Sequence, residues 1–124
     1  MRESVPPKLI SQRIRNRIYE YLESVAEFPE NRGVWDLNEL VNEWGFYVAE
    51  PFDAKQFPEP TFAPTEVAAI ADVHSAWLAF ADVTPQSIND EGQAIRTPQW
   101  TALVEASRKA CGTFSLRGKL PEEE

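Results

Sequence analysis

The chain has 124 residues, which suits one domain with its own hydrophobic core. Its formal net charge of −8 disfavours direct binding to nucleic acid and to anionic membrane surfaces, and it favours a basic protein partner. There is a single cysteine, Cys111, so no intramolecular disulfide can form. The N-terminus lacks the pattern of a signal peptide, and no stretch is long and apolar enough to span a membrane. We therefore expect a cytoplasmic protein.

The first predicted helix covers about residues 9–28. Its apolar side chains recur with a period of about 3.6 residues and form one stripe, made of Ile10, Ile14, Ile18, Tyr21, Leu22 and Val25. Arg13, Arg15 and Arg17 lie away from this stripe. We expect them on a solvated face, with an ion pair between Arg17 and Glu20. A role of these arginines in contacting a partner is the alternative.

The second predicted helix covers residues 37–44. Asp36 and Glu39 have the spacing of a capping box, which indicates where the helix begins. Gly45 follows at the position that a left-handed residue often takes after a helix, so we expect the helix to end there.

The segment 46–64 is rich in aromatic residues and contains four prolines. Prolines at this density exclude a helix and a central strand. We predict a long loop that crosses the surface, with a minor β element near residues 46–48. A loop of this length is usually functional or disordered, and the regularly placed aromatic residues argue against disorder.

Residues 65–82 form the longest apolar run of the chain and are rich in alanine. A helix that is apolar over most of its circumference is usually covered by several partners, so we predict that this helix is central. A single helical turn that reaches Glu91 and is stopped by Gly92, and a last helix over 98–111 that is ended by Gly112, complete the prediction.

The predicted fold is therefore all-α and forms a single domain, 1–124, with about four main helices packed around residues 65–82. Residues 1–8 and 117–124 are expected to be flexible.

The sequence offers few groups for catalysis. His74, the only histidine, lies on the apolar side of the central helix, where a hydrogen-bonded core residue is the commoner role. Cys111 is interpreted as a small core residue. No metal-binding, phosphate-binding or nucleophile motif occurs. We predict a protein that is not an enzyme and that requires no metal and no cofactor. The alternative is a carboxylate-based enzyme or a small-ligand pocket walled by Trp35, Trp44, Trp77 or Trp100.

Charge is unevenly distributed along the chain. Residues 28–95 carry twelve acidic side chains against two basic ones, whereas both ends are slightly positive. If the acidic side chains surround exposed aromatic rings, the surface would suit a basic protein, with the rings as anchors. The alternative is that the rings only cover the core. The predicted partner contacts are Glu30, Asp36, Glu39, Glu43, Tyr47, Glu50, Phe52, Asp53, Phe57 and Glu59.

The leading functional hypothesis is a non-enzymatic binding module that neutralises or masks a basic protein. Bacterial immunity proteins and inhibitors that bind cationic toxin domains are of this type, although no motif identifies the chain as one of them. The alternative is a self-associating adaptor or structural protein. In that case a homodimer would bury the apolar stripe of the first helix or the central helix.

Overall fold

The computed structural model describes residues 7–28, 37–48, 52–84 and 91–120. Over these residues the protein is all-α, as predicted, and contains no strand. Its helices are α1 (Pro7–Ala26), α2 (Leu37–Tyr47), the 3-10 helix η1 (Ala54–Gln56), α3 (Pro64–Asp82), the one-turn α4 (Glu91–Ala94) and α5 (Pro98–Ser115).

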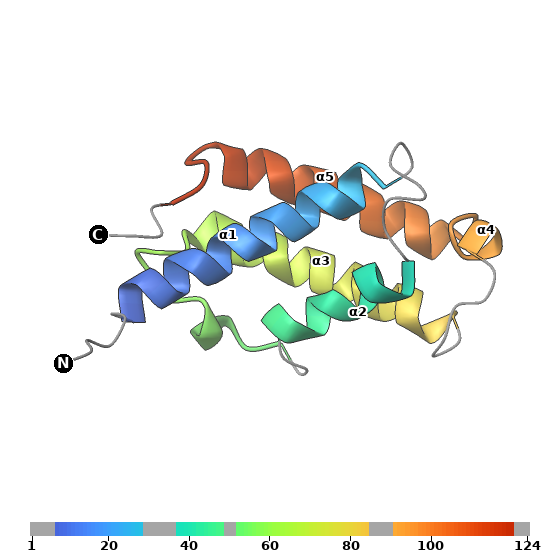
Figure 1. Ribbon diagram of the computed structural model, residues 1–124, viewed down its shortest axis with the longest axis horizontal. Coiled ribbons are helices and arrows are strands. Elements are labelled where there is room, and N and C mark those ends of the chain that lie inside the picture. Colours follow the sequence, from blue (N-terminus) through green and yellow to red (C-terminus); the bar gives the residue numbers. More distant parts are fainter. Residues whose placement is uncertain (1–6, 29–36, 49–51, 85–90, 121–124) are drawn as a thin grey trace.

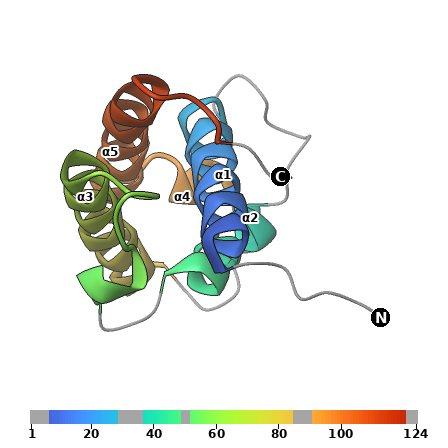
Figure 2. The ribbon, with the colours of Figure 1, turned by 90° about the vertical axis from the view of Figure 1, so that its left-hand side faces the viewer.

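The four long helices pack side by side (Figure 1). The end view in Figure 2 places α3 and α5 on one side of the molecule and α1 and α2 on the other. α5 packs against both α3 and α1, and α1 also packs against α2. The core between them consists of large apolar side chains that include Ile18, Leu22, Val25, Leu40, Trp44, Ile70, Val73, Phe80, Leu103 and Phe114, all fully buried.

Three helices extend beyond the glycines at which the sequence predicts their ends, and the shortest of them is α4, which contains Gly92. α2 continues through Gly45 to Tyr47, so Phe46 and Tyr47 are helical, and the predicted β element does not form there. α5 likewise continues through Gly112 to Ser115. Among the described glycines, the left-handed one is Gly118, with φ of 69°. Its N–H donates to the carbonyl of Phe114 at 2.9 Å and so ends α5.

α3 lies at the side of the molecule and not at its centre. α5 covers one side of it, and α2 meets it through Trp77, whose Nε1 donates to the carbonyl of Val41 at 2.7 Å. The outer side of α3 is exposed at Ala68, Asp72 and Ala79. Because alanine has little apolar surface, an alanine-rich helix can face solvent at low cost, so α3 is covered where it meets α5 and α2 but stays exposed on its outer side.

The described part of the loop before α3 covers the core. The carboxylate of Asp53 accepts the N–H of Lys55 at 2.9 Å and caps η1. The rings of Phe57 and Phe62 then insert into the interior, where their residues are only 3% and 1% exposed. The aromatic residues of this loop thus serve mainly in packing.

Candidate functional site

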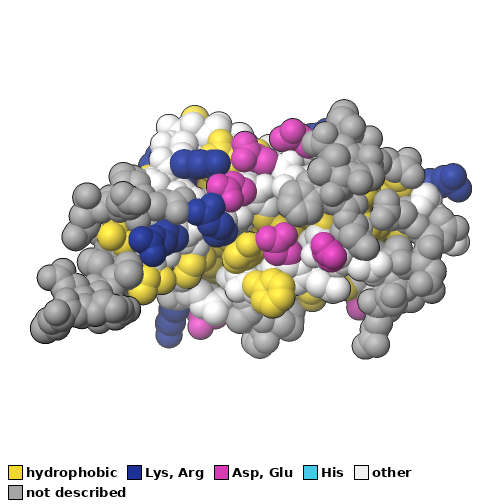
Figure 3. Space-filling view, in the orientation of Figure 1, with side chains coloured by type: hydrophobic (Ala, Val, Ile, Leu, Met, Phe, Trp, Pro, Cys, Tyr) yellow, Lys and Arg dark blue, Asp and Glu magenta, His cyan; other side chains and the backbone are white. Residues whose placement is uncertain are grey.

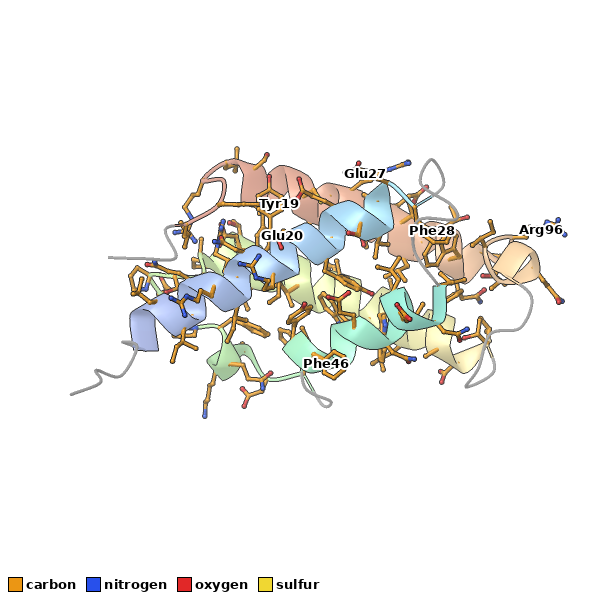
Figure 4. All side chains as sticks on the ribbon, in the orientation of Figure 1. Tyr19, Glu20, Glu27, Phe28, Phe46 and Arg96 are labelled. Atoms are coloured by element: carbon orange, nitrogen blue, oxygen red, sulfur yellow. The ribbon has the colours of Figure 1, made fainter. Side chains whose placement is uncertain are left out.

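The outward sides of α1 and α2 form the surface with the most distinctive chemistry. We call it the α1/α2 face and define it by Glu20, Glu23, Glu27, Glu39, Glu43, Phe46 and Tyr47. Figure 3 shows that Asp and Glu side chains gather over the middle of this face, while Lys and Arg side chains gather toward the end where α1 begins. Figure 4 places Glu20 and Glu27 along α1 and Phe46 near the end of α2.

Helical spacing explains why the acidic side chains share one face. Glu20 and Glu23 are three residues apart on α1, and Glu27 follows directly after the end of α1, with its N–H bonded to the carbonyl of Glu23 at 2.9 Å. Glu39 and Glu43 are four residues apart on α2. The two rows come together because Tyr21 of α1 packs on α2, with its ring centroid 6.4 Å from that of Tyr47.

Phe46 is the most exposed large hydrophobic residue in the described part of the chain, with 84% of its surface accessible. The buried side of α2 is formed by Leu37, Leu40, Val41 and Trp44, and Phe46 points away from it. An exposed phenylalanine among carboxylates is available for contact with another molecule.

Tyr47 fixes the position of one of these carboxylates. Its hydroxyl donates a hydrogen bond to Oε1 of Glu43 at 2.7 Å. Partial burial, followed by this hydrogen bond and the charge of Glu43, raises the pKa of Tyr47 to about 12. The hydroxyl therefore stays protonated at neutral pH and holds the Glu43 carboxylate in a defined orientation.

Glu20 marks the boundary between the acidic and the basic parts of the face. Its two carboxylate oxygens accept from Arg17 at 2.6 Å and from Lys119 at 3.1 Å. The ion pair predicted between Arg17 and Glu20 is confirmed. Burial raises the pKa of Glu20, but the two basic groups outweigh it, and the net shift is downward.

The structure brings together only part of the predicted set of contact residues. Glu39, Glu43 and Tyr47 belong to the α1/α2 face. Asp53 and Glu59 are exposed on the loop before α3, and Phe52 is half-buried with its ring 5.8 Å from that of Phe57. Phe57 is a core residue and is not accessible as an anchor. Glu30, Asp36 and Glu50 lie outside the described residues.

The predicted set of contact residues lacks Phe46, the two glutamates Glu20 and Glu23 of α1, and Glu27 just after it. The glutamates belong to a segment whose net charge is slightly positive, so the net charge of that segment does not reveal an acidic surface. Their spacing opposite the apolar stripe was the available signal. The sequence predicts a loop at Phe46, whereas the structure places Phe46 in α2, which directs its ring outward.

His74 is a hydrogen-bonded core residue, as predicted. It is 4% exposed, and its Nδ1 accepts the Nε1–H of Trp44 at 3.0 Å. Its ring stacks on Trp77 with an interplanar angle of 11°. Because Nδ1 accepts, the neutral ring carries its proton on Nε2.

Cys111 lacks the environment of a reactive thiol. Burial, and after it the charges of Glu23 and Glu27, raises the pKa of Cys111 to about 12. A nucleophilic cysteine requires the opposite shift. Among the described residues, no group of three or more His, Cys, Asp or Glu side chains is placed to hold a metal ion.

Two grooves lie elsewhere on the surface. The larger, about 440 Å³, runs between α3 and α5 over five alanines and is bordered by Asp72, Glu105 and Lys109. Trp100 lines the smaller one, of about 260 Å³. Trp44 and Trp77 donate hydrogen bonds inside the fold, and Trp35 lies outside the described residues.

Comparison of the chain with protein-family models, with curated proteins and with solved structures found no match. None of the helices in the described ranges has the length and apolar character needed to cross a membrane.

Proposed function

We propose that the protein is a non-enzymatic binding module that engages a basic protein and masks it. The observation that supports this proposal best is the α1/α2 face, where acidic side chains gather (Figure 3) and where the exposed ring of Phe46 shares α2 with Glu39 and Glu43. A partner of the complementary kind carries lysine or arginine side chains around an apolar surface that can receive this ring.

The physical roles of the two kinds of side chain differ. Burying the ring of Phe46 supplies affinity, because aromatic residues at the centre of an interface contribute most of the binding energy. The surrounding carboxylates accelerate encounter with a cationic surface and reject acidic ones. Glu43 contributes further because Tyr47 already orients its carboxylate, which lowers the entropy lost on binding.

Affinity capture with paired variants tests this proposal. The immobilised wild-type protein is compared with two double variants. The test variant is Glu39→Lys/Glu43→Lys on α2. The control is Asp72→Lys/Asp82→Lys on α3, where both aspartates are exposed and the change in net charge is the same. We expect a basic protein that binds the wild type and the α3 variant, elutes with salt, and is lost from the α2 variant.

Phe46→Ser separates the contribution of the ring from that of the charges. It leaves every carboxylate in place, so we expect tenfold weaker binding or more, mainly through faster dissociation, while the charge variants mainly slow association. Equal loss of the partner in the α2 and α3 variants, or binding that salt does not affect, would count against the α1/α2 face as the site.

A further inference from the structure

The apolar stripe of α1 is buried along only half of its length. Ile18, Leu22 and Val25 are fully buried, whereas Ile10 and Ile14, which the sequence predicts to be buried with them, are 46% and 39% exposed. Ile10 and Ile14 are one turn apart on α1 and so present one continuous apolar surface.

This exposed half of the stripe leads toward Phe46. Tyr21, further along the same side of α1, contacts Tyr47 of α2, and the charge of Arg17 acts on the hydroxyl of Tyr47. The end of α2 therefore lies beside the stretch of α1 from Arg17 to Tyr21, and Ile14 lies about one to two turns before it. Figure 3 shows hydrophobic side chains in a band from the end where α1 begins toward the end of α2, where Figure 4 places Phe46.

The charged side chains are also separated along this surface, with basic ones at one end and acidic ones at the other. Arg13 and Arg17 belong to the end that carries Ile10 and Ile14, while Glu39 and Glu43 are on α2 with Phe46. The surface thus has an isoleucine end with basic side chains and a phenylalanine end with acidic side chains (Figure 3).

A surface of this kind is complementary to itself. A two-fold axis that lies in the surface and crosses α1 between its two ends exchanges the ends. Phe46 of one copy then meets Ile10 and Ile14 of the other, and the arginines of each copy face the glutamates of the other. Every contact forms twice, and each removes apolar surface from water or pairs opposite charges.

We propose that this surface binds a second copy of the chain in a symmetric dimer. The dimer covers the carboxylates to which we assign the basic partner, so dimerisation and partner binding exclude each other. The inference goes beyond the proposed function, and it is tested on the purified protein alone. Its failure therefore leaves the proposed function standing.

Sedimentation velocity measures the oligomeric state of the purified chain at concentrations up to roughly 100 µM, where a dimer with a Kd of about 1 µM is almost fully formed. We expect the mass of a dimer. Phe46→Ser is expected to weaken the dimer by more than tenfold. Asp72→Lys/Asp82→Lys, on α3, serves as the control and should leave it intact.

Charge exchange gives the sharper test. Two double variants are made, Arg13→Glu/Arg17→Glu and Glu39→Arg/Glu43→Arg. In a dimer of either variant, side chains of the same charge would face each other at both places related by the two-fold axis. Each variant alone should therefore be monomeric. A mixture of the two variants restores opposite charges at both places and should form a heterodimer. Circular dichroism confirms that each variant is folded. A monomeric wild type, or a mixture that remains monomeric, would overturn the proposal.

Discussion

Glu66 is the residue on which most of the polar interior depends. Its carboxylate accepts Nε–H and Nη2–H of Arg15 at 3.1 and 2.7 Å, Nη2–H of Arg117 at 2.6 Å and the N–H of Ala63 at 3.0 Å. Arg15 is fully buried, which contradicts the solvated position that the sequence predicts for it. Its charge is compensated by the carboxylate and by the carbonyl of Gly118, which accepts at 2.6 Å.

The substitution Glu66→Gln should destabilise the fold strongly, since removing one partner of a buried ion pair leaves an uncompensated charge and costs about 3–5 kcal/mol. Urea denaturation measures this loss. Glu59→Gln, an exposed change on the loop before α3, is the matched control and should alter the free energy of unfolding by less than about 0.5 kcal/mol. Comparable losses in the two variants would show that the network does not stabilise the fold.

Glu66 should also make the stability depend on pH. Burial raises the pKa of its carboxyl group, but the hydrogen bonds from Arg15, Arg117 and Ala63 outweigh it and lower the pKa from 4.5 to about 2. Below about pH 5 the unfolded chain therefore takes up a proton that the folded one does not, and stability falls as the pH approaches 2, by at most about 3 kcal/mol.

Denaturation curves between pH 7 and pH 2 measure this slope, and the contribution of Glu66 should be absent from Glu66→Gln. An unchanged slope in that variant would assign the acid sensitivity to other carboxylates.

At the scale of single residues, the sequence predicts those side-chain roles that depend on residues nearby in the chain. The role of His74 followed from the apolar residues around it on one helix, and the pair of Arg17 and Glu20 from their spacing. Arg15 was predicted wrongly because its partner is 51 residues away and on another helix. The tertiary contact decides its burial, and no local pattern reports that contact.

At the scale of the helix, the two glycines inside α2 and α5 give a prediction. A Cβ atom added at Gly45 or at Gly112 would meet nothing within 4 Å, and neither glycine has a positive φ. Gly45→Ala and Gly112→Ala should each raise the free energy of unfolding by about 0.5–1 kcal/mol, because alanine restricts the unfolded chain and favours the helix.

Thermal unfolding measures both gains. Gly118→Ala provides the contrast: its φ of 69° is strained for any residue with a Cβ, so this variant should lose stability. If all three substitutions act in the same direction, helix propensity is not the cause.

Periodicity predicted the helices themselves well, because long amphipathic patterns are strong signals. The C-terminal ends were less predictable, since glycine permits a left-handed residue but does not impose one. The sequence also does not predict that half of the α1 stripe is exposed. The pattern identifies an apolar side, and the packing of α2 and α5 determines how much of that side is covered.

At the scale of the whole molecule, residues 117–120 connect elements that are distant in sequence. Arg117 pairs with Glu66 and donates to the carbonyl of Thr61 at 2.6 Å. Asn16 donates to the carbonyl of Leu120 at 2.7 Å and accepts its N–H at 2.9 Å. The sequence predicts flexibility for 117–124, but the four residues described here are fixed to α1 and to the start of α3.

Removal of residues 117–124 should therefore lower the free energy of unfolding by several kcal/mol, because Glu66, Arg15 and Asn16 each lose a partner. Removal of residues 121–124 alone keeps all of these contacts and should cost less than about 0.5 kcal/mol. Urea denaturation of the two shortened chains measures the difference, and equal stability would mean that the contacts of 117–120 contribute nothing.

The charge of the whole molecule was only partly predictable. The acidic character of the middle segment is plain in the sequence, but the α1/α2 face combines two glutamates from that segment with Glu20 and Glu23 of α1 and with Glu27 just after it. Which acidic residues meet is a property of how the helices pack, and so is the outward position of Phe46 beside them.

The contacts of residues 117–120 also bear on how the chain folds during synthesis. The ribosome makes α1 and α3 well before Arg117, Gly118 and Leu120, which stay inside its exit tunnel while the earlier helices emerge. Arg15 and Glu66 then meet without their remaining partners, so we expect the nascent helices to associate only loosely until residues 117–120 have emerged. Protease digestion of ribosome-stalled chains, with these residues inside the tunnel or outside it, would reveal this delay as a gain of resistance once they have emerged.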